Sequence, residues 1–140
     1  MVKQEVLSSA SNVLRTVEEL TAYVEPVGPR ISRYNKIYNV SANVDSLIVS
    51  YTTPPNYIFF LTGVIVSGSL DGEYIVYRDS SPIFGIRTSS AKRTEQWVGN
   101  DKSNFPFEPG QVASIRVTHY DIGKLGEFYG TIIGILSPIE

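Results

Sequence analysis

The residue best suited to acid–base chemistry is His119, the one histidine in the 140-residue chain. A catalytic histidine needs a nucleophile and an orienting group within hydrogen-bond reach. His119 instead alternates with Ile115 and Val117 in a strand-like pattern, which favours a structural histidine near the end of a strand. The chain also has no Gly-x-Ser-x-Gly, phosphate-loop or His-Glu-x-x-His motif. We therefore predict that it is not an enzyme and has no catalytic residues.

The glycines and acidic residues do not form a recognisable phosphate or metal site. Asp71 and Glu73 flank a turn, but a calcium loop supplies more oxygen ligands at closer spacing. The glycine-rich stretch 67–72 opens a strand, so it lacks the helix N-terminus that makes such loops bind phosphate. The absence of cysteine excludes disulfides and cysteine-based zinc sites. We expect no metal and no cofactor.

Trp97, with Arg93 and Gln96 beside it, is the remaining candidate for a ligand or partner loop. An exposed tryptophan with amide and charged neighbours can form a platform for a sugar ring. The alternative is that Trp97 covers one end of the core or lies at a subunit contact, because tryptophan is common at interfaces. We favour packing over glycan binding. Arg87, Lys92 and Arg93 form a basic cluster that we expect to pair with acids on a neighbouring molecule.

The composition predicts one globular domain without a polyanionic partner. Hydrophobic residues make up 42% of the chain, charged residues 19%, and the net charge is −2. This charge gives no reason to expect nucleic acid as a partner. The longest apolar run, Ile58–Val66, is too short to span a bilayer, and residues 1–7 lack the apolar core of a signal peptide. We expect no membrane interaction.

Short β-strands separated by turns fill most of the chain after residue 43. The expected strands are 44–52, 57–67, 73–79, 83–89, 111–120 and 125–136, with a polar stretch at 90–108 that carries Trp97. Asp71-Gly72 favours a hairpin between the second and third of these strands. Repeated short strands without intervening helices predict an all-β fold, an antiparallel β-sandwich of the jelly-roll type, over residues 44–140.

Two of the expected strands, Tyr57–Val66 and Phe128–Leu136, are apolar on both sides, although a sandwich strand normally shows one side to water. A large exposed apolar patch is unusual on a monomer. The outer side must therefore be covered, either by the chain's own N-terminal helix or by neighbouring copies. The predicted sheet-interface residues are Phe59, Ile65, Tyr129, Ile133 and Ile135.

Residues 1–25 predict an N-terminal amphipathic α-helix that acts as an anchor or in oligomerisation. Apolar residues recur at alternating spacings of four and three, which is a heptad pattern. The predicted helix-interface residues are Val6, Ala10, Val13, Val17, Leu20 and Val24. Such a helix packs on its own sheet or docks on another molecule, and the pattern leaves both open. Pro26 ends the helix, and residues 26–43 are expected to form an extended linker.

The order of short motifs along residues 44–136 resembles that of small jelly-roll proteins in the virions of tailed bacteriophages. The motifs are Phe60-Leu61-Thr62-Gly63-Val64, Ser67-Gly68, Asp71-Gly72, Tyr74-Ile75-Val76-Tyr77, Arg87-Thr88, Pro109-Gly110 and Glu127-Phe128-Tyr129-Gly130-Thr131-Ile132-Ile133-Gly134. The resemblance implies a capsid decoration or cement protein, or a fibre or spike module, commonly trimeric. It carries over no catalytic residue, and the N-terminal arm lies outside it.

The expected function is therefore that of a non-enzymatic virion structural protein. It would form a homotrimer and attach to a capsid or tail protein through residues 1–43. It would be located in the virion, and in the cytoplasm of the infected bacterial host during assembly. The alternative is a glycan-binding module that recognises a host receptor.

Overall fold

The computed structural model describes residues 26–100 and 103–139, which fold into β-strands joined by turns and loops. The strands are β1 (Arg30–Val40), β2 (Ser46–Thr52), β3 (Tyr57–Gly68), β4 (Glu73–Arg78), β5 (Ser81–Arg87), β6 (Thr94–Val98), β7 (Phe105–Phe107), β8 (Val112–Thr118) and β9 (Gly126–Pro138). In this part of the chain, no helix is long and apolar enough to cross a lipid bilayer. The helix predicted for residues 1–25, with its interface residues, lies outside the described residues.

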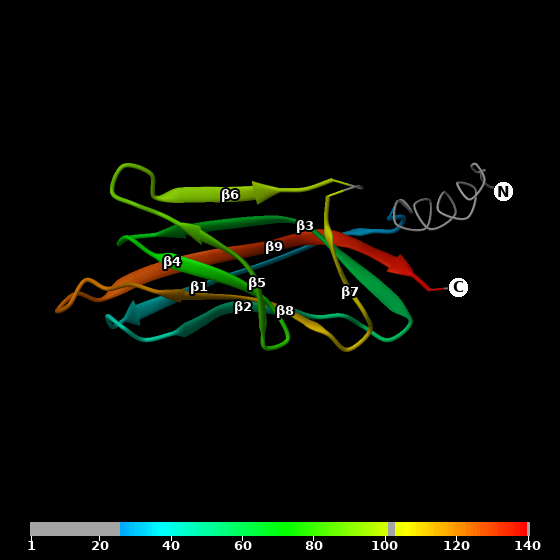
Figure 1. Ribbon diagram of the computed structural model, residues 1–140, viewed down its shortest axis with the longest axis horizontal. Helices are drawn as coiled ribbons and strands as arrows, with labels where there is room; N and C mark the ends of the chain where they lie inside the picture. Colours follow the sequence, from blue (N-terminus) through cyan, green and yellow to red (C-terminus); the bar gives the residue numbers. More distant parts are fainter. Residues whose placement is uncertain (1–25, 101–102, 140) are drawn as a thin grey trace, which may run out of the picture.

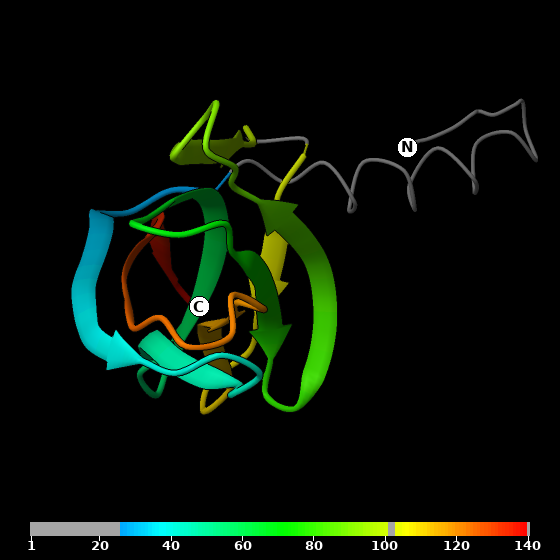
Figure 2. The same cartoon turned by 90° about the vertical axis from the view of Figure 1, so that its left-hand side faces the viewer.

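The strands form two antiparallel sheets that pack face to face, which confirms the predicted all-β antiparallel sandwich (Figures 1 and 2). One sheet has the order β1-β9-β3-β6, with β7 also paired to β3, and the other has the order β2-β8-β4-β5. The long strands β3 and β9 are the central pair of the five-stranded sheet. They run side by side from Tyr57 opposite Pro138 to Gly68 opposite Phe128.

The pairing is nested around one hairpin. Strands β4 and β5 form that hairpin, and outside it β3 pairs with β6, β2 pairs with β8, and β1 pairs with β9. Strands that are far apart in the sequence therefore lie next to each other in space. The strand pairs alternate between the two sheets, so the chain crosses from one sheet to the other at each step outward.

The core lies between the sheets and is made of the inward side chains of the central strands. Phe59 and Leu61 from β3, Tyr74 and Val76 from β4, and Ile132 from β9 are almost completely buried. Aromatic contacts bridge the layer, such as Tyr74 with Phe128, whose ring centroids lie 6.0 Å apart. Burial of this apolar surface is the main favourable contribution to folding.

Side chains also close both open edges of the sandwich. On one edge, the Asn35 side chain of β1 donates a hydrogen bond to the Ile48 carbonyl of β2 (2.8 Å). On the other edge, Phe84 of β5, Trp97 of β6 and Phe105 form an aromatic cluster with centroid distances of 5.1 to 5.4 Å. Each edge therefore joins one strand of each sheet.

The linker predicted for residues 26–43 is wrong for most of its length, because residues 30–40 form strand β1. This strand pairs with β9 from Arg30 opposite Ile135 to Val40 opposite Gly126. It lies at the edge of its sheet and its inward positions include few apolar side chains. The alternating pattern is therefore weak, and only the pairing with β9 shows that the segment is a strand.

The hairpin predicted at Asp71-Gly72 is also wrong. Strands β3 and β4 lie in different sheets, and residues 69–72 cross between them. The tight hairpin is the next one, between β4 and β5, where Asp79 has a positive φ of 55°. The polar stretch predicted as 90–108 likewise contains β6 and β7. Turn residues thus marked the places where the chain reverses, but not which strands pair.

Gly134 illustrates how closely β3 and β9 approach. A Cβ at this position would overlap the Phe60 carbonyl oxygen and the Phe59 ring. We expect Gly134→Ala to lower the free energy of unfolding by about 1–3 kcal/mol, because overpacking forces neighbouring groups to move. Gly85→Ala is the matched control, since its nearest contact there would be 3.5 Å away. Urea denaturation of both variants tests this, and equal stabilities would contradict it.

Burial of Tyr74 gives the fold a dependence on alkaline pH. Desolvation raises the pKa of this phenol from 10.0 to about 12. Between pH 10 and about 12 the unfolded chain ionises while the folded protein keeps the phenol neutral, so stability falls over this range. The contribution of the Tyr74 phenol to the stability of the fold is fully present below pH 10.

We expect Tyr74→Phe to weaken this alkaline loss. Urea midpoints of the wild type and the variant, compared between pH 9 and 11, measure the difference. The loss is reduced rather than abolished, because burial also raises the pKa of Tyr51. An unchanged pH dependence in Tyr74→Phe would show that this side chain is not responsible.

Candidate interaction surface

The outward side of the five-stranded sheet carries a run of apolar side chains outside the core. In antiparallel pairs, residues directly opposite each other point to the same side of the sheet. The register therefore aligns Phe60 with Ile135, and Gly63 with Ile133, on the side away from the core. We call this side the outer face. Its apolar members are Tyr34, Ile58, Phe60, Ile65, Val98, Pro106, Tyr129, Ile133 and Ile135.

Four of the five predicted sheet-interface residues lie on the outer face, but Phe59 does not. Phe59 is completely buried in the core. Strand β3 has an irregularity at Thr62, between Leu61 and Gly63, where one extra residue enters its pairing with β9. Such a bulge reverses the alternation. Residues that share a side by simple counting, such as Phe59 and Ile65, therefore point to opposite sides.

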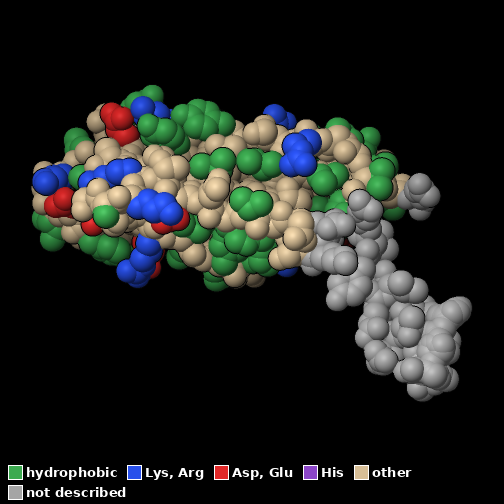
Figure 3. All heavy atoms as spheres, turned by 90° about the horizontal axis from the view of Figure 1, so that it is seen from above, with side chains coloured by type: hydrophobic (Ala, Val, Ile, Leu, Met, Phe, Trp, Pro, Cys, Tyr) green, Lys and Arg blue, Asp and Glu red, His purple; other side chains and the backbone are tan. Residues whose placement is uncertain are grey.

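The outer face has an apolar part and a polar part. The polar part contains Lys36 of β1, Tyr129 of β9 and Ser67 of β3, which lie opposite one another across the sheet. There Lys36 forms an ion pair with Glu127 (3.3 Å) and lies 5.0 Å from the centre of the Tyr129 ring. Seen from above, hydrophobic side chains extend along the molecule, while most charged side chains gather toward one end (Figure 3).

The apolar part lies at the end of the sheet where β1 begins and β9 finishes (Figure 1). The chain before β1 is attached there to β9. The Val27 amide donates to the Ser137 hydroxyl (2.8 Å), which in turn donates to the Val27 carbonyl. The Leu136 amide donates to the Pro29 carbonyl (2.9 Å). Residues 1–25 therefore connect to the sandwich beside the apolar part of the outer face.

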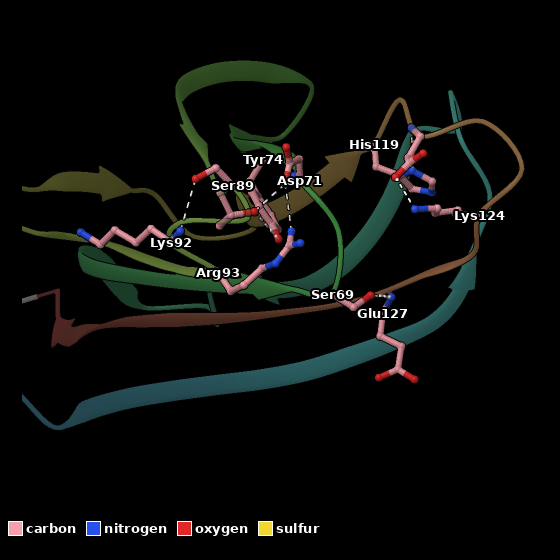
Figure 4. Close-up of polar contacts among 12 residues, drawn as sticks. Ser69, Asp71, Tyr74, Ser89, Lys92, Arg93, His119, Lys124 and Glu127 are labelled. Atoms are coloured by element: carbon pink, nitrogen blue, oxygen red, sulfur yellow. Dashed lines mark hydrogen bonds and ion pairs between the residues drawn. The ribbon is translucent and has the colours of Figure 1, made fainter.

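Polar contacts hold the loops at the opposite end of the sandwich (Figure 4). The predicted basic cluster lies near these loops, but its members pair with acids of the same chain. Arg87 contacts Glu73 at 2.9 Å, and Arg93 contacts Asp71 at 3.0 Å. The Tyr120 hydroxyl, followed by Arg87, lowers the pKa of Glu73 by hydrogen bonding to its carboxylate. Arg87 and Arg93 therefore have acidic partners within their own chain and not, as predicted, on a neighbouring molecule.

His119 is a structural residue, as its place in the strand pattern predicted. It is completely buried, and its ring stacks on Phe128 with centroids 5.7 Å apart. Its Nε2 lies 2.7 Å from the Val40 carbonyl oxygen, and its Nδ1 accepts a hydrogen bond from the Asp121 amide (3.2 Å). A carbonyl only accepts and an amide N–H only donates, so the hydrogen is on Nε2. Both ring nitrogens are therefore used, Nε2 to join β1 to the loop after β8 and Nδ1 within that loop.

Trp97 also has a packing role. It lies on β6 rather than in a loop, opposite Val64 of the core. Its ring contacts Phe84 and Phe105 and is half-buried against the core. Gln96 points to the outer face, and Arg93 precedes the strand in its ion pair with Asp71. The structure thus separates the three residues predicted as one ligand or partner loop.

Several outer-face residues, above all Phe60, Ile58 and Val98, are not among the interface residues predicted from the sequence. Val98 is 70% exposed at the edge of the sheet. The apolar character of both sides of β3 was visible in the sequence, but the bulge at Thr62 hid which residues share a side. Tyr34 was missed because residues 26–43 were predicted to be a linker. Among the described residues, no group of three or more His, Asp or Glu side chains could hold a metal ion.

Comparisons with known proteins give little further information. No protein-family model matches the chain, and no curated protein matches it either. Among solved structures, one match is a chain from the acidic stable capsid of Helicobacter pylori bacteriophage KHP30. It has a TM-score of 0.48 and 8% identity, and the match covers 80% of this chain and 98% of that chain. A TM-score and a sequence identity this low do not establish a shared function.

The packing role of Trp97 predicts a loss of stability on its removal. We expect Trp97→Ala to lower the free energy of unfolding by about 2–3 kcal/mol, because Phe84 and Phe105 lose the ring between them. Gln96→Ala, which changes the opposite side of the same strand, should have little effect. Urea denaturation measures both. A Trp97→Ala protein as stable as the wild type would contradict the packing role.

Proposed function

We propose that this chain is a structural protein of a bacteriophage virion, a non-enzymatic module that acts through contacts with other proteins. The observation that carries the proposal is the apolar outer face of the five-stranded sheet. A sandwich with this face exposed to water would be an unusual monomer, and such patches mark protein contacts. The motif order in residues 44–136 supports the phage assignment, since it resembles that of phage virion proteins.

The strand order supports the finer assignment of the sandwich as a jelly roll. A jelly roll is a two-sheet sandwich of eight strands in which two Greek keys wrap around each other. The four nested pairs, β1 with β9, β2 with β8, β3 with β6 and β4 with β5, give this arrangement, with β7 as an addition. Jelly rolls form viral capsid proteins, among other classes. The strand order thus fits a virion protein without requiring one.

Within the virion, the sandwich associates as a homotrimer, and residues 1–25 attach it to sister copies or to a capsid or tail protein. Two features support this arrangement. The apolar part of the outer face and the attachment point of residues 1–25 lie at the same end of the molecule. Strands β1 and β9 form this end and are hydrogen bonded to each other along most of their length. The arm is therefore connected to a well-paired part of the sheet. The role is that of a decoration, cement or fibre protein.

Analysis of particles tests this proposal. Particles are purified on a density gradient from a lysate of the phage that encodes the chain, and the chain is quantified in them by mass spectrometry. We expect the wild type to co-migrate with the particles. Ile133→Lys, which places a charge on the outer face, should reduce its amount in particles by roughly tenfold or more, because a charge buried without a partner is costly.

Ile75→Lys is the matched control for this experiment. Ile75 is a half-buried isoleucine on the outward side of the four-stranded sheet, opposite Arg116 and Gly85. The control should therefore enter particles like the wild type. A wild-type chain that stays in the particle-free fraction would contradict the proposed function.

A further inference from the structure

The apolar part of the outer face and the predicted N-terminal helix match in length. On β3 the apolar part extends from Ile58 to Ile65, which is roughly 23 Å at about 3.3 Å per residue. The apolar positions of the arm extend from Val6 to Val24, which is roughly 27 Å at 1.5 Å per residue in a helix. A helix that covers one face of a sheet is a stable layer arrangement.

The start of the described chain shows where the arm is attached. The contacts of Val27 with Ser137 and of Pro29 with Leu136 hold residues 27–29 along the end of β9. Proline disfavours the helical conformation for the residue before it, so Pro29 keeps Gly28 out of a helix. The described chain therefore follows β9 to the end of the sheet, and its first residue, Pro26, lies at this end.

From these two observations we propose that residues 6–24 of one copy form a helix that packs on the outer face of a second copy. The stripe Val6, Ala10, Val13, Val17, Leu20 and Val24 would lie against the apolar part of that face. This proposal rests on the proposed function and names the partner of the same face. The stripe is too short for a stable coiled coil by itself, so it gains most from an existing apolar surface.

This contact joins two different surfaces, the arm of one copy and the outer face of the next. Such a heterologous contact forms a closed ring when its rotation returns to the first copy. In a ring of three copies, every arm binds the outer face of a neighbouring copy. This ring is the trimer of the proposed function. It also covers the outer face without requiring two identical faces to meet.

A mixing experiment with two full-length variants tests the contact. The arm variant carries Val13→Glu and Val17→Glu, and its control carries Ser8→Glu and Ser11→Glu, which lie on the opposite side of the predicted helix. The face variant is Ile133→Lys, and its control is Ile75→Lys. Size-exclusion chromatography with light scattering gives the mass of each protein alone and of equimolar mixtures. Circular dichroism and thermal melting verify that each variant is folded.

We expect the wild type and both controls to be oligomers, and the arm and face variants to be monomers when each is alone. A mixture of the two variants should form a 1:1 complex, because the face variant supplies an intact arm and the arm variant an intact face. An arm variant that remains oligomeric would show that copies meet face to face, and would overturn the proposal. A monomeric wild type, or variants that do not combine, would overturn it as well.

These outcomes are separate from the test of the proposed function. The mixing experiment uses purified protein and reports only which surfaces touch, whereas the particle analysis reports where the protein is located. A chain that is found in particles but whose arm does not bind a second copy would refute this inference and leave the proposed function standing. A chain whose copies exchange arms but which is absent from particles would do the reverse.

Discussion

The structure depends on the pairing of β3 with β9, two long strands that are apolar on both sides. Their inward side chains, such as Phe59 and Ile132, form the centre of the core. Both strands are also hydrogen bonded on their other sides, β9 to β1 and β3 to β6 and β7. Because successive side chains of a paired strand point to opposite sides of the sheet, the outward side chains cannot turn into the core. Phe60, Ile133 and Ile135 must therefore lie on the outside of the sheet.

This constraint explains why the sheet has an apolar surface on its outer side. The other features that could bear function have roles inside the fold. His119 joins β1 to the loop after β8 through Nε2 and accepts a hydrogen bond within that loop at Nδ1, and Trp97 closes the edge between β5 and β6. The basic residues near the end loops pair with acids of the same chain. The apolar outer face has no such role among the described residues.

The sequence predicted the all-β antiparallel sandwich and most strands because alternation and turn residues are local signals. It did not predict β1, whose few apolar positions become meaningful only beside β9. It also assigned β3 and β4 to one hairpin, because Asp71-Gly72 signals a reversal without specifying the sheet that the next strand joins. For the candidate surface, the sequence showed that both sides of β3 are apolar. The bulge at Thr62, which decides the side of Phe59, depends on pairing with β9 and leaves no local pattern.

The central claim is that protein covers the outer face, and the chain allows a direct test because it has no cysteine. A single cysteine is introduced by Ile133→Cys on the outer face, or by Ile75→Cys on the outward side of the four-stranded sheet. The rate of reaction with a maleimide is then measured in the full-length protein under native conditions. The account predicts that the cysteine at position 133 reacts much more slowly than the one at position 75. Equal rates at the two positions would show that the outer face is open to water and would contradict the account.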